Sequence, residues 1–573
     1  MLLCLLLAAL GVGAFSVRLL HRMGLPDGRM LRLAALPGLG LALCEAFGAS
    51  LRLYGRVRWA SPLLWSAALG LFVVCTLFFC ALWRVLPRAE ERLNLAKPRF
   101  AGLFSRGWLL WLLMLLCWLP CWLAIFPGNF VYDTVGEYDQ CAFGFDPAFP
   151  RLHSWLNISV INRVFGLTGS YAAGAALFTA LHMVFLALLF AWMLQRLCRL
   201  GVNARLLLLS LCWCALFPTV QMLAVSPIRD LMFAGNLTAL CFLLLLLRRD
   251  RAAFWRDRRL PLLLGCVSAL TVLSRDNIAP ALSVMILLAL SLPLVLRAGK
   301  GNRKAALLFA FSALLLWGGL SAFLGRVCRP PAENAGSPSA LAALTQPITR
   351  CYALHGQDWS EAERARYAEF FITEGQTYVE NDGDVSLAAL KSLRSEGGYG
   401  DFLRLWLGLF RRYPATYLDA WLAHTRSLWL PGDGIDGYVR SGSYTDAQSA
   451  YFYYRAAESG PARTLLRLDA LRGFYERVGL HTRLERIPVL RQLFSLGFHF
   501  WLLLGTLFYL RWRRMACSPL WVLLLYALGN LLDPLMLVRY FAAFYLAFPL
   551  LSVSLLQPGL LYADRRLATT EIG

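Results

Sequence analysis

The sequence predicts an all-α, polytopic membrane protein, and two observations lead to this prediction. Of the 573 residues, 58% are hydrophobic and only 16% are charged, with a mean hydropathy of +0.56, whereas a soluble protein of this size carries about a quarter charged residues. Long apolar runs also recur along the chain, and a run of about 20 apolar residues is enough for one helical crossing of a bilayer. We therefore expect a bundle of membrane-spanning helices.

Counting one crossing for each such run gives about thirteen spans. They cover approximately residues 2–17, 34–50, 60–86, 107–127, 170–195, 206–225, 231–247, 260–274, 278–296, 305–325, 495–510, 518–532 and 538–556. The second span is the weakest, because Glu45 lies within it and a charge in mid-membrane costs about 2.5–3.5 kcal/mol on insertion scales. The stretch 153–168 is predicted as a partly inserted helix. Because Met1–Leu20 lacks a basic start and a clear cleavage site, we interpret it as the first span.

The net charge of +22 comes mainly from Lys and Arg in short loops between apolar runs. In a soluble chain this charge would suggest nucleic acid as a partner, but basic short loops are what membrane topology places on the cytoplasmic side. We therefore expect no nucleic acid, with the N-terminus outside the cell and the C-terminus in the cytoplasm. The basic loop Arg52–Arg58 is the exception, because this assignment places it outside. The fifteen cysteines show no paired metal-ligand spacing.

Four segments follow from this topology. Residues 1–106 hold N-terminal membrane helices, 107–325 a membrane core with an acidic first outer loop at 126–169, 326–494 an extracytoplasmic, mainly helical domain, and 495–573 the last helices and a short cytoplasmic tail.

Three helices are predicted within the extracytoplasmic domain. Ser360 and Glu363 have the spacing of a capping box that opens the first. Asp401–Arg412 and Ala415–Leu430 have the pattern of two amphipathic helices, separated at Pro414. Their Trp-rich apolar faces favour a position on the membrane surface; the alternative is a small soluble core, since amphipathicity alone does not separate the two. These faces hold Phe402, Leu405, Trp406, Leu409, Phe410, Tyr417, Trp421, Leu428 and Trp429.

The first candidate for chemistry is the acidic stretch that follows the span 107–127. Pro127 and Gly128 are expected to stop that helix, and Asp133, Glu137 and Asp139 follow within seven residues of one another. At a membrane boundary a carboxylate can act as a general base toward an acceptor hydroxyl or amide. Asp133 is our candidate base, with Glu137 and Asp139 as alternatives from the same loop. An ordinary solvated loop would have the same pattern.

A second group consists of arginines at predicted outer ends of spans. Arg229, Arg275 and Arg539 could grip a phosphate, because a guanidinium binds its oxygens bidentately. Arg229 has Asp230 beside it and Arg275 has Asp276 beside it, so simple neutralisation of neighbours is the alternative. The predicted substrate-binding residues are Glu137, Asp139, Gln140, His153, Arg229, Asp230, Arg275 and Arg539.

No cofactor is indicated with certainty. Oxygen ligands such as Asp133 suit a divalent cation, but no set of ligands in the sequence defines a metal site. A glycine-rich phosphate loop and the HExxH, GxSxG and paired CxxC motifs are all missing from the sequence. Their absence argues against P-loop transporters, zinc proteases and lipase-like hydrolases.

The order of several short motifs resembles that of polytopic type-C glycosyltransferases, and more closely a family of uncharacterised bacterial multi-pass proteins of that superfamily. The similar stretches are Phe126 to Gln140 with His153, Ser226–Asp230, Ser274–Asn277, Thr345–Arg350, Pro414–Pro431 and Arg539–Tyr540. Arg229 replaces a lysine of the family pattern, and Asp276 departs from it. The resemblance implies a sugar donor on polyprenyl phosphate, an outer active site, inversion at the sugar carbon, and Asp133 as the base.

The leading hypothesis is therefore a glycosyltransferase of the bacterial cell membrane. It would move a sugar from the polyprenyl-phosphate donor to a glycan, lipid or protein acceptor of the envelope, with membrane lipids around it. A transporter or flippase of a lipid-linked glycan is the alternative, since it would use the same arginines. A transporter should show inverted repeats and interrupted spans, and the sequence shows neither. A non-catalytic scaffold is the third hypothesis.

Overall fold

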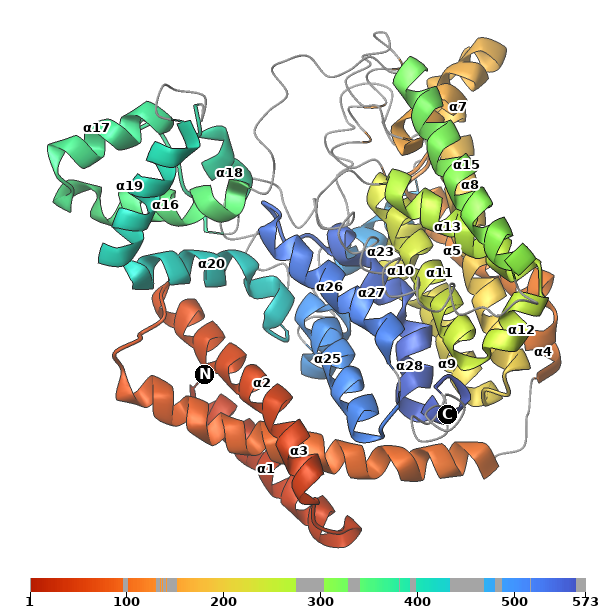
Figure 1. Ribbon diagram of the computed structural model, residues 1–573, viewed down its shortest axis with the longest axis horizontal. Coiled ribbons are helices and arrows are strands. Elements are labelled where there is room, and N and C mark those ends of the chain that lie inside the picture. The colour runs from red at the N-terminus through yellow and green to blue at the C-terminus, as the bar shows by residue number, and fades with distance from the viewer. Residues whose placement is uncertain are drawn as a thin grey trace.

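The computed structural model describes residues 2–95, 101–129, 134, 137, 141, 152–274, 303–327, 341–380, 382–391, 398–432, 468–479, 487–515 and 517–562. Within these residues the chain forms α-helices, short 3-10 turns and two isolated β-bridges, with no β-strand. The chain is an all-α membrane protein. Its helices group into an N-terminal hairpin set, a central bundle, a lateral domain and a C-terminal set that fills the middle (Figure 1).

The N-terminal hairpin set consists of α1 (Leu2–Met23), α2 (Gly28–Tyr54) and α3 (Pro62–Leu95), and α3 packs against both of the others. The central bundle contains α4 (Ala101–Ser105), α5 (Gly107–Ala124), α7 (Leu152–Thr168), α8 (Tyr171–Arg199), α9 (Ala204–Leu216), α10 (Pro218–Ala224), α11 (Arg229–Arg249), α12 (Arg251–Arg256), α13 (Arg259–Ser274) and α15 (Arg303–Val327). Protein covers almost all of α11, whereas α15 packs chiefly on α13. The start of α11 therefore lies inside the bundle.

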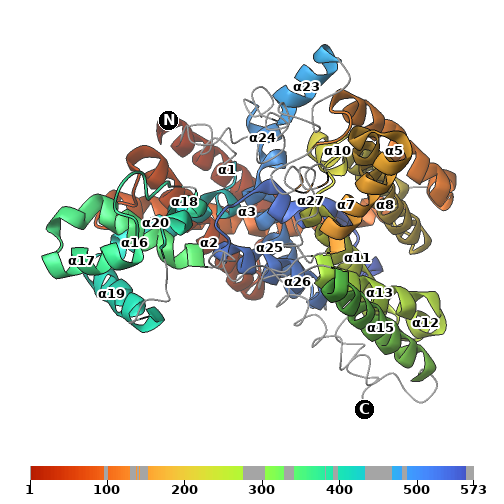
Figure 2. The same cartoon turned by 90° about the horizontal axis from the view of Figure 1, so that it is seen from above.

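The C-terminal elements run between the bundle and the lateral domain, as Figures 1 and 2 both show. They are α23 (Asp469–Gly479), α24 (Pro488–Phe494), α25 (Leu496–Trp512), η6 (Ser518–Leu520), α26 (Trp521–Gly529), η7 (Asn530–Leu532), η8 (Val538–Phe541), α27 (Ala542–Leu546), α28 (Phe548–Leu556) and η9 (Pro558–Leu560). Most of their buried side chains belong to the same large hydrophobic core as α5, α8, α9 and α11. The last helices are thus an integral part of the bundle.

Six described helices are long and apolar enough to cross a membrane, and the number rises to eight if two bent pairs each form one span. The pairs are α9 with α10, bent by 56°, and the segment Val538–Leu546 with α28, bent by 44°. Pro218 and Pro549 sit in the first turns of α10 and α28, and a proline cannot donate the hydrogen bond that would continue the preceding helix. Our expectation of uninterrupted spans was therefore wrong at two places.

Each predicted span that falls within the described residues is occupied by helix, although length and composition alone select six to eight of them. α2 contains Glu45 and still passes as a candidate span. The predicted span 278–296 lies outside the described residues. α7 occupies the stretch predicted as a partly inserted helix.

The lateral domain consists of α16 (Ala342–His355), η3 (Gly356–Asp358), α17 (Glu361–Phe370), α18 (Gly383–Ala388), α19 (Gly398–Arg412) and α20 (Pro414–Trp429), and we call it the α16–α20 domain. It has a small core of its own. The buried members are Ile348, Cys351, Trp359, Tyr367, Phe370, Phe371, Ala389, Leu390, Phe402, Leu409 and Tyr417. Burial of the Tyr417 ring raises the pKa of its hydroxyl.

Both amphipathic helices of the sequence prediction exist, and several of the apolar side chains named for their faces are packed inside the domain. Phe402, Leu409 and Tyr417 are buried in the local core, and Trp406 packs against it while its Nε1 donates to the carbonyl of Leu344 at 2.9 Å. The alternative of a small core is therefore correct for these side chains. The pattern could not decide this, because a local core and a lipid surface select the same apolar face.

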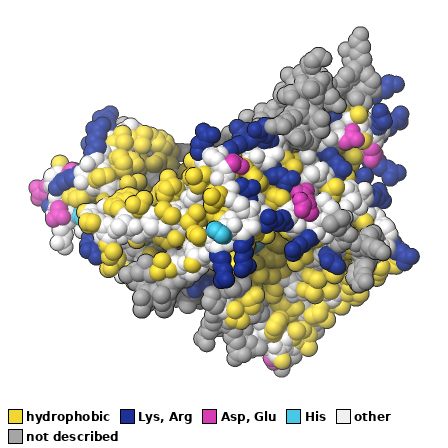
Figure 3. All heavy atoms as spheres, turned by 90° about the horizontal axis from the view of Figure 1, so that it is seen from below, with side chains coloured by type: hydrophobic (Ala, Val, Ile, Leu, Met, Phe, Trp, Pro, Cys, Tyr) yellow, Lys and Arg dark blue, Asp and Glu magenta, His cyan; other side chains and the backbone are white. Residues whose placement is uncertain are grey.

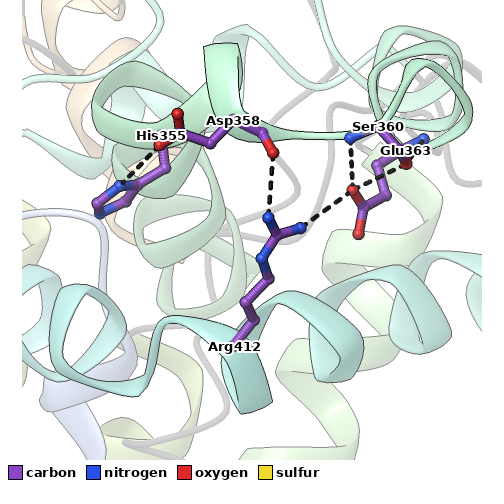
Figure 4. Close-up of polar contacts among 5 residues, drawn as sticks. All are labelled: His355, Asp358, Ser360, Glu363 and Arg412. Carbon is purple, nitrogen blue, oxygen red and sulfur yellow. Dashed lines mark hydrogen bonds and ion pairs between the residues drawn. The ribbon is translucent and has the colours of Figure 1, made fainter.

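Surface contacts close the far end of the α16–α20 domain (Figure 4). The predicted capping box is confirmed, since Ser360 and Glu363 bond each other's backbone N–H groups. Arg412 at the end of α19 reaches across to Glu363 Oε2 at 3.5 Å and to the carbonyl of Asp358 at 3.1 Å. His355 Nδ1 lies 3.8 Å from a carboxylate oxygen of Asp358. These groups tie α16, α17 and α19 together at the surface.

The α16–α20 domain also holds the loop between α2 and α3. Asp419 of α20 accepts hydrogen bonds from the backbone of Val57 at 3.2 Å and from Trp59 Nε1 at 3.0 Å. Arg350 of α16 donates to the carbonyl of Gly55 at 2.7 Å. This loop contains the second half of the basic stretch Arg52–Arg58, and these contacts hold it against the α16–α20 domain.

Candidate functional site

The first part of the site is the turn that follows α5. The helix ends at Ala124, close to the stop that Pro127 and Gly128 predict. The peptide bond between Phe126 and Pro127 is cis. Trp122 Nε1 donates to the carbonyl of Pro127 at 3.0 Å, so the last turn of α5 holds the chain as it reverses. The predicted helix stop is therefore real and has a defined geometry.

The chain then docks on the segment before α11. The backbone N–H of Asn129 donates to the carbonyl of Val225 at 2.9 Å, and its side-chain amide donates to Ser226 Oγ at 2.7 Å. Ser226 in turn donates to the carbonyl of Met222 at 2.7 Å. Two motifs of the sequence analysis, 97 residues apart, thus lie side by side within the bundle.

The second part is a buried ion pair between α11 and η8. Arg539 Nε lies 3.8 Å from Asp230 Oδ2, and both side chains are more than nine-tenths buried. Asp230 stands in the first turn of α11, where the positive end of the helix dipole stabilises a carboxylate. The guanidinium of Arg539 lies over the ring of Tyr540 at 5.0 Å. Arg229 adds a second guanidinium to the same helix end.

The loop that carries Arg539 is fixed from the other side by the α16–α20 domain. His424 Nε2 donates to the carbonyl of Asp533 at 3.0 Å, and the backbone N–H of Gly383 donates to the carbonyl of Pro534 at 2.8 Å. Burial lowers the pKa of His424, which favours the neutral ring. The loop 533–539 therefore connects this domain directly to Asp230.

The third part is a carboxylate enclosed by α7. Glu137 Oε1 accepts from Ser154 Oγ at 2.5 Å and Glu137 Oε2 accepts from Asn157 Nδ2 at 2.7 Å, while His153 Nδ1 lies 3.7 Å from Oε2. All four side chains are buried. Glu137 is therefore not a solvated acid of an ordinary loop, which was the alternative interpretation of the sequence. Two predicted residues, Glu137 and His153, are brought together here.

Ser154 and Asn157 were not predicted as site residues. The sequence contained a signal for them. Asn157 follows His153 by four positions and Ser154 by three, which places these polar groups on one helical face. The partner across that face, Glu137, lies in a separate segment. Sequence spacing alone could not have identified it.

The predicted residues Asp133, Asp139, Gln140 and Arg275 lie outside the described residues. Ser274, which precedes Arg275, is buried at the end of α13, and Asn236 of α11 donates to its hydroxyl at 3.3 Å. The ends of α13 and the first turns of α11 are therefore neighbours. Among the residues that the structure describes, no group of three His, Cys, Asp or Glu side chains is arranged to hold a metal ion.

A family model matches residues 156–530, and its description is a family of unknown function, DUF6020. The chain belongs to this family. The match contains Arg229, Asp230 and Arg275 but begins after Glu137 and His153 and ends before Arg539. No curated protein and no solved structure matches the chain significantly.

Proposed function

We propose that this protein is an integral membrane glycosyltransferase. It moves a sugar from a polyprenyl-phosphate donor to an envelope acceptor at the outer face of the bacterial cell membrane. The observation that carries the proposal is the buried pair of Asp230 and Arg539. Hydrophobic bundles rarely keep charged side chains unless they serve a substrate, an ion or a partner charge, and this pair joins two of the motifs that the sequence analysis had selected.

In this proposal the arginines bind the phosphate leaving group. Its negative charge grows in the transition state, where fixed cationic donors stabilise it most. Asp230 holds Arg539 in one orientation, and Arg229 lies at the same end of α11. Asp133 is the general base toward the acceptor, and Arg275 a third phosphate contact. A divalent cation is compatible with the proposal but is not required by it.

The proposed topology has about thirteen spans in a type-C arrangement, with the N-terminus outside and the C-terminus in the cytoplasm. The alternation of basic loops supports it. Figure 3, which views the molecule from below, shows Lys and Arg side chains gathered over the middle and right of that face. The contacts of Asp419 and Arg350 with the α2–α3 loop favour a common side for this loop and the α16–α20 domain.

One observation favours a second candidate, a transporter or flippase of a lipid-linked glycan. Interrupted helices near a buried charge are typical of transporters, and α9–α10 and the last helices are bent in this way. Both candidates bind the same lipid phosphate. They differ in whether a sugar bond is broken.

The test is sugar transfer by purified full-length variants in lipid vesicles supplied with polyprenyl-phosphate sugar. Asp133→Asn removes the proton acceptor and keeps the shape, so turnover should fall by about 10²–10⁴-fold, the usual contribution of general base catalysis, while donor binding persists. Asp139→Asn is the matched control from the same loop and should retain turnover.

Loss of turnover in Asp139→Asn with normal turnover in Asp133→Asn would identify Asp139 as the general base instead of Asp133. Normal transfer by every variant would contradict the assignment of the base. Movement of the lipid-linked donor across the vesicle membrane without transfer would favour the flippase. The absence of both activities would favour a scaffold.

A further inference from the structure

The apolar stripe of α19 is wider than the core of its own domain can cover. Phe402 and Leu409 point into that core, yet Leu403 and Leu407 stay 41% and 45% exposed. These two leucines are four residues apart, so they lie one above the other along the helix at the edge of the buried face. An amphipathic helix normally buries its apolar stripe against another surface, but the core of this domain leaves these two leucines exposed.

Basic side chains border this row on the side away from the core. Arg404 follows Leu403 and is 80% exposed, although it also pairs with Asp401 at 3.0 Å. Arg411 stands one turn beyond Leu407 and is exposed. An apolar row with arginines along its margin is the pattern of a helix that lies in a lipid interface, with the aliphatic side chains inward and the guanidinium groups at the phosphates.

The first half of α20 also has exposed apolar side chains. Leu418 is 44% exposed and Trp421 is 36% exposed. Leu422, one turn after Leu418 on the same face, packs into a cluster with the ends of α2 and α3, as do Trp429 and Leu430. The second half of α20 therefore packs on the membrane helices, while Leu418 and Trp421 in its first half stay exposed.

Tryptophans lie beside the cluster that α20 joins. Trp59 lies in the α2–α3 loop with its ring 5.1 Å from Phe47, and Trp65 in the first turn of α3 donates to the carbonyl of Trp59 at 2.8 Å. Trp65 stays exposed at the outside of the bundle. Tryptophan is enriched where membrane helices leave the hydrocarbon. Trp421 belongs to a helix that ends on the same cluster.

We propose that Leu403, Leu407, Leu418 and Trp421 insert into the lipid leaflet beneath the α16–α20 domain. The occupant is the bilayer that the chain itself spans, and Arg404 and Arg411 face its headgroup phosphates. The inference concerns the side chains at the edge of the domain core, not the Trp406 face that the core encloses. It does not depend on the proposed enzymatic activity.

Photo-crosslinking of the full-length protein in phospholipid vesicles tests this proposal. A benzophenone amino acid replaces Leu407 in one variant, Leu418 in a second and Arg364 in a third. Arg364 is an exposed residue of α17 and serves as the matched control. After irradiation, mass spectrometry of the purified chain should show a phospholipid added at positions 407 and 418 and background labelling at 364.

Crosslinks from 407 or 418 to a second copy of the chain would instead make this face a protein interface. Equal lipid labelling at all three positions, or none at 407 and 418, would overturn the proposal as well. Because the replaced leucines are exposed, these variants should fold. Gel filtration in detergent verifies folding before the vesicles are made, so that only folded protein is compared.

Discussion

Charged side chains are arranged differently in the α16–α20 domain and at the start of α11. In the domain, Arg412 and Glu363 form an ion pair at the surface, where their side chains are 49% and 32% exposed. In the bundle, Asp230 and Arg539 are enclosed by hydrophobic helices. Water can solvate both charges of the exposed pair. The charges of the buried pair must be stabilised by protein groups instead of water.

The two kinds of ion pair differ in what they contribute to the stability of the fold. An exposed pair contributes about 0–1 kcal/mol, because solvent screens it and ordering the side chains costs entropy. A buried pair gains little over a hydrophobic pair of the same volume, but removing one partner leaves a charge that the interior cannot solvate. A sequence that retains such a pair therefore points to a use beyond stability, and this can be tested by mutation.

The largest effect is expected for Arg539→Ala. The carboxylate of Asp230 then stays buried without this partner, which costs about 3–5 kcal/mol of folding free energy. Detergent-solubilised protein should unfold at a markedly lower temperature in a thermal gel-filtration assay. The double variant Asp230→Leu/Arg539→Met should recover most of the loss. If Arg539→Ala unfolds like the wild type, the pair does not constrain the bundle.

A comparable loss confined to the other region is expected for Leu409→Ala. Removing a buried leucine from the small core costs about 2–5 kcal/mol, and the core has few other side chains to close the cavity. Hydrogen exchange in the full-length protein should increase in α16–α20 and stay unchanged in α11. Equal increases in both regions would show that the domain and the bundle unfold together. Leu354→Ala, which truncates an exposed leucine of α16 in the same domain, is the control.

A smaller effect concerns pH and His424. Its pKa is lowered in the folded protein by burial, so the unfolded chain binds the proton more readily. Stability should therefore fall as the pH drops below the unfolded value of about 6.5, by at most about 1.4 kcal/mol per pH unit. His424→Gln can still donate to Asp533 and should flatten this dependence. Thermal unfolding measured between pH 8 and pH 5, an interval of about three units around that pKa, provides the comparison.

The smallest effects belong to the contacts of Figure 4. Arg412→Ala should cost less than about 1 kcal/mol, because the pair with Glu363 is exposed. Ser360→Ala removes a helix cap and should cost about 1 kcal/mol. Hydrogen exchange of α17 in the same full-length protein measures both. A loss in Arg412→Ala as large as that in Arg539→Ala would erase the distinction between the two regions.

The sequence predicted the helical class and most helix positions, because long apolar runs and caps such as Ser360 are local signals. It also selected Asp230, Arg539, Glu137 and His153, since polar residues at the ends of apolar runs stand out. It did not predict which charges would meet. The partner of Asp230 lies in a separate segment of the chain, and pairing of this kind depends on how the helices pack.

Two other features were not predicted. The bends at Pro218 and Pro549 were missed, because a proline at a helix start and a proline inside a span look alike in an apolar run. The local core around Phe402 was only the alternative interpretation, because the residues that cover Phe402 come from α17 and its neighbours. That contact is distant in sequence, whereas the bends are local to the two prolines.

The hydrogen bond between Val57 and Asp419 has a consequence for the order in which the protein is built. The two residues are 362 positions apart, so the α2–α3 hairpin leaves the ribosome long before the helix that fastens it has been synthesised. Until then the α2–α3 loop has no contact with Asp419. A chain that stops before α20 therefore lacks this fastening for its first hairpin, and the N-terminal hairpin acquires it only late in synthesis.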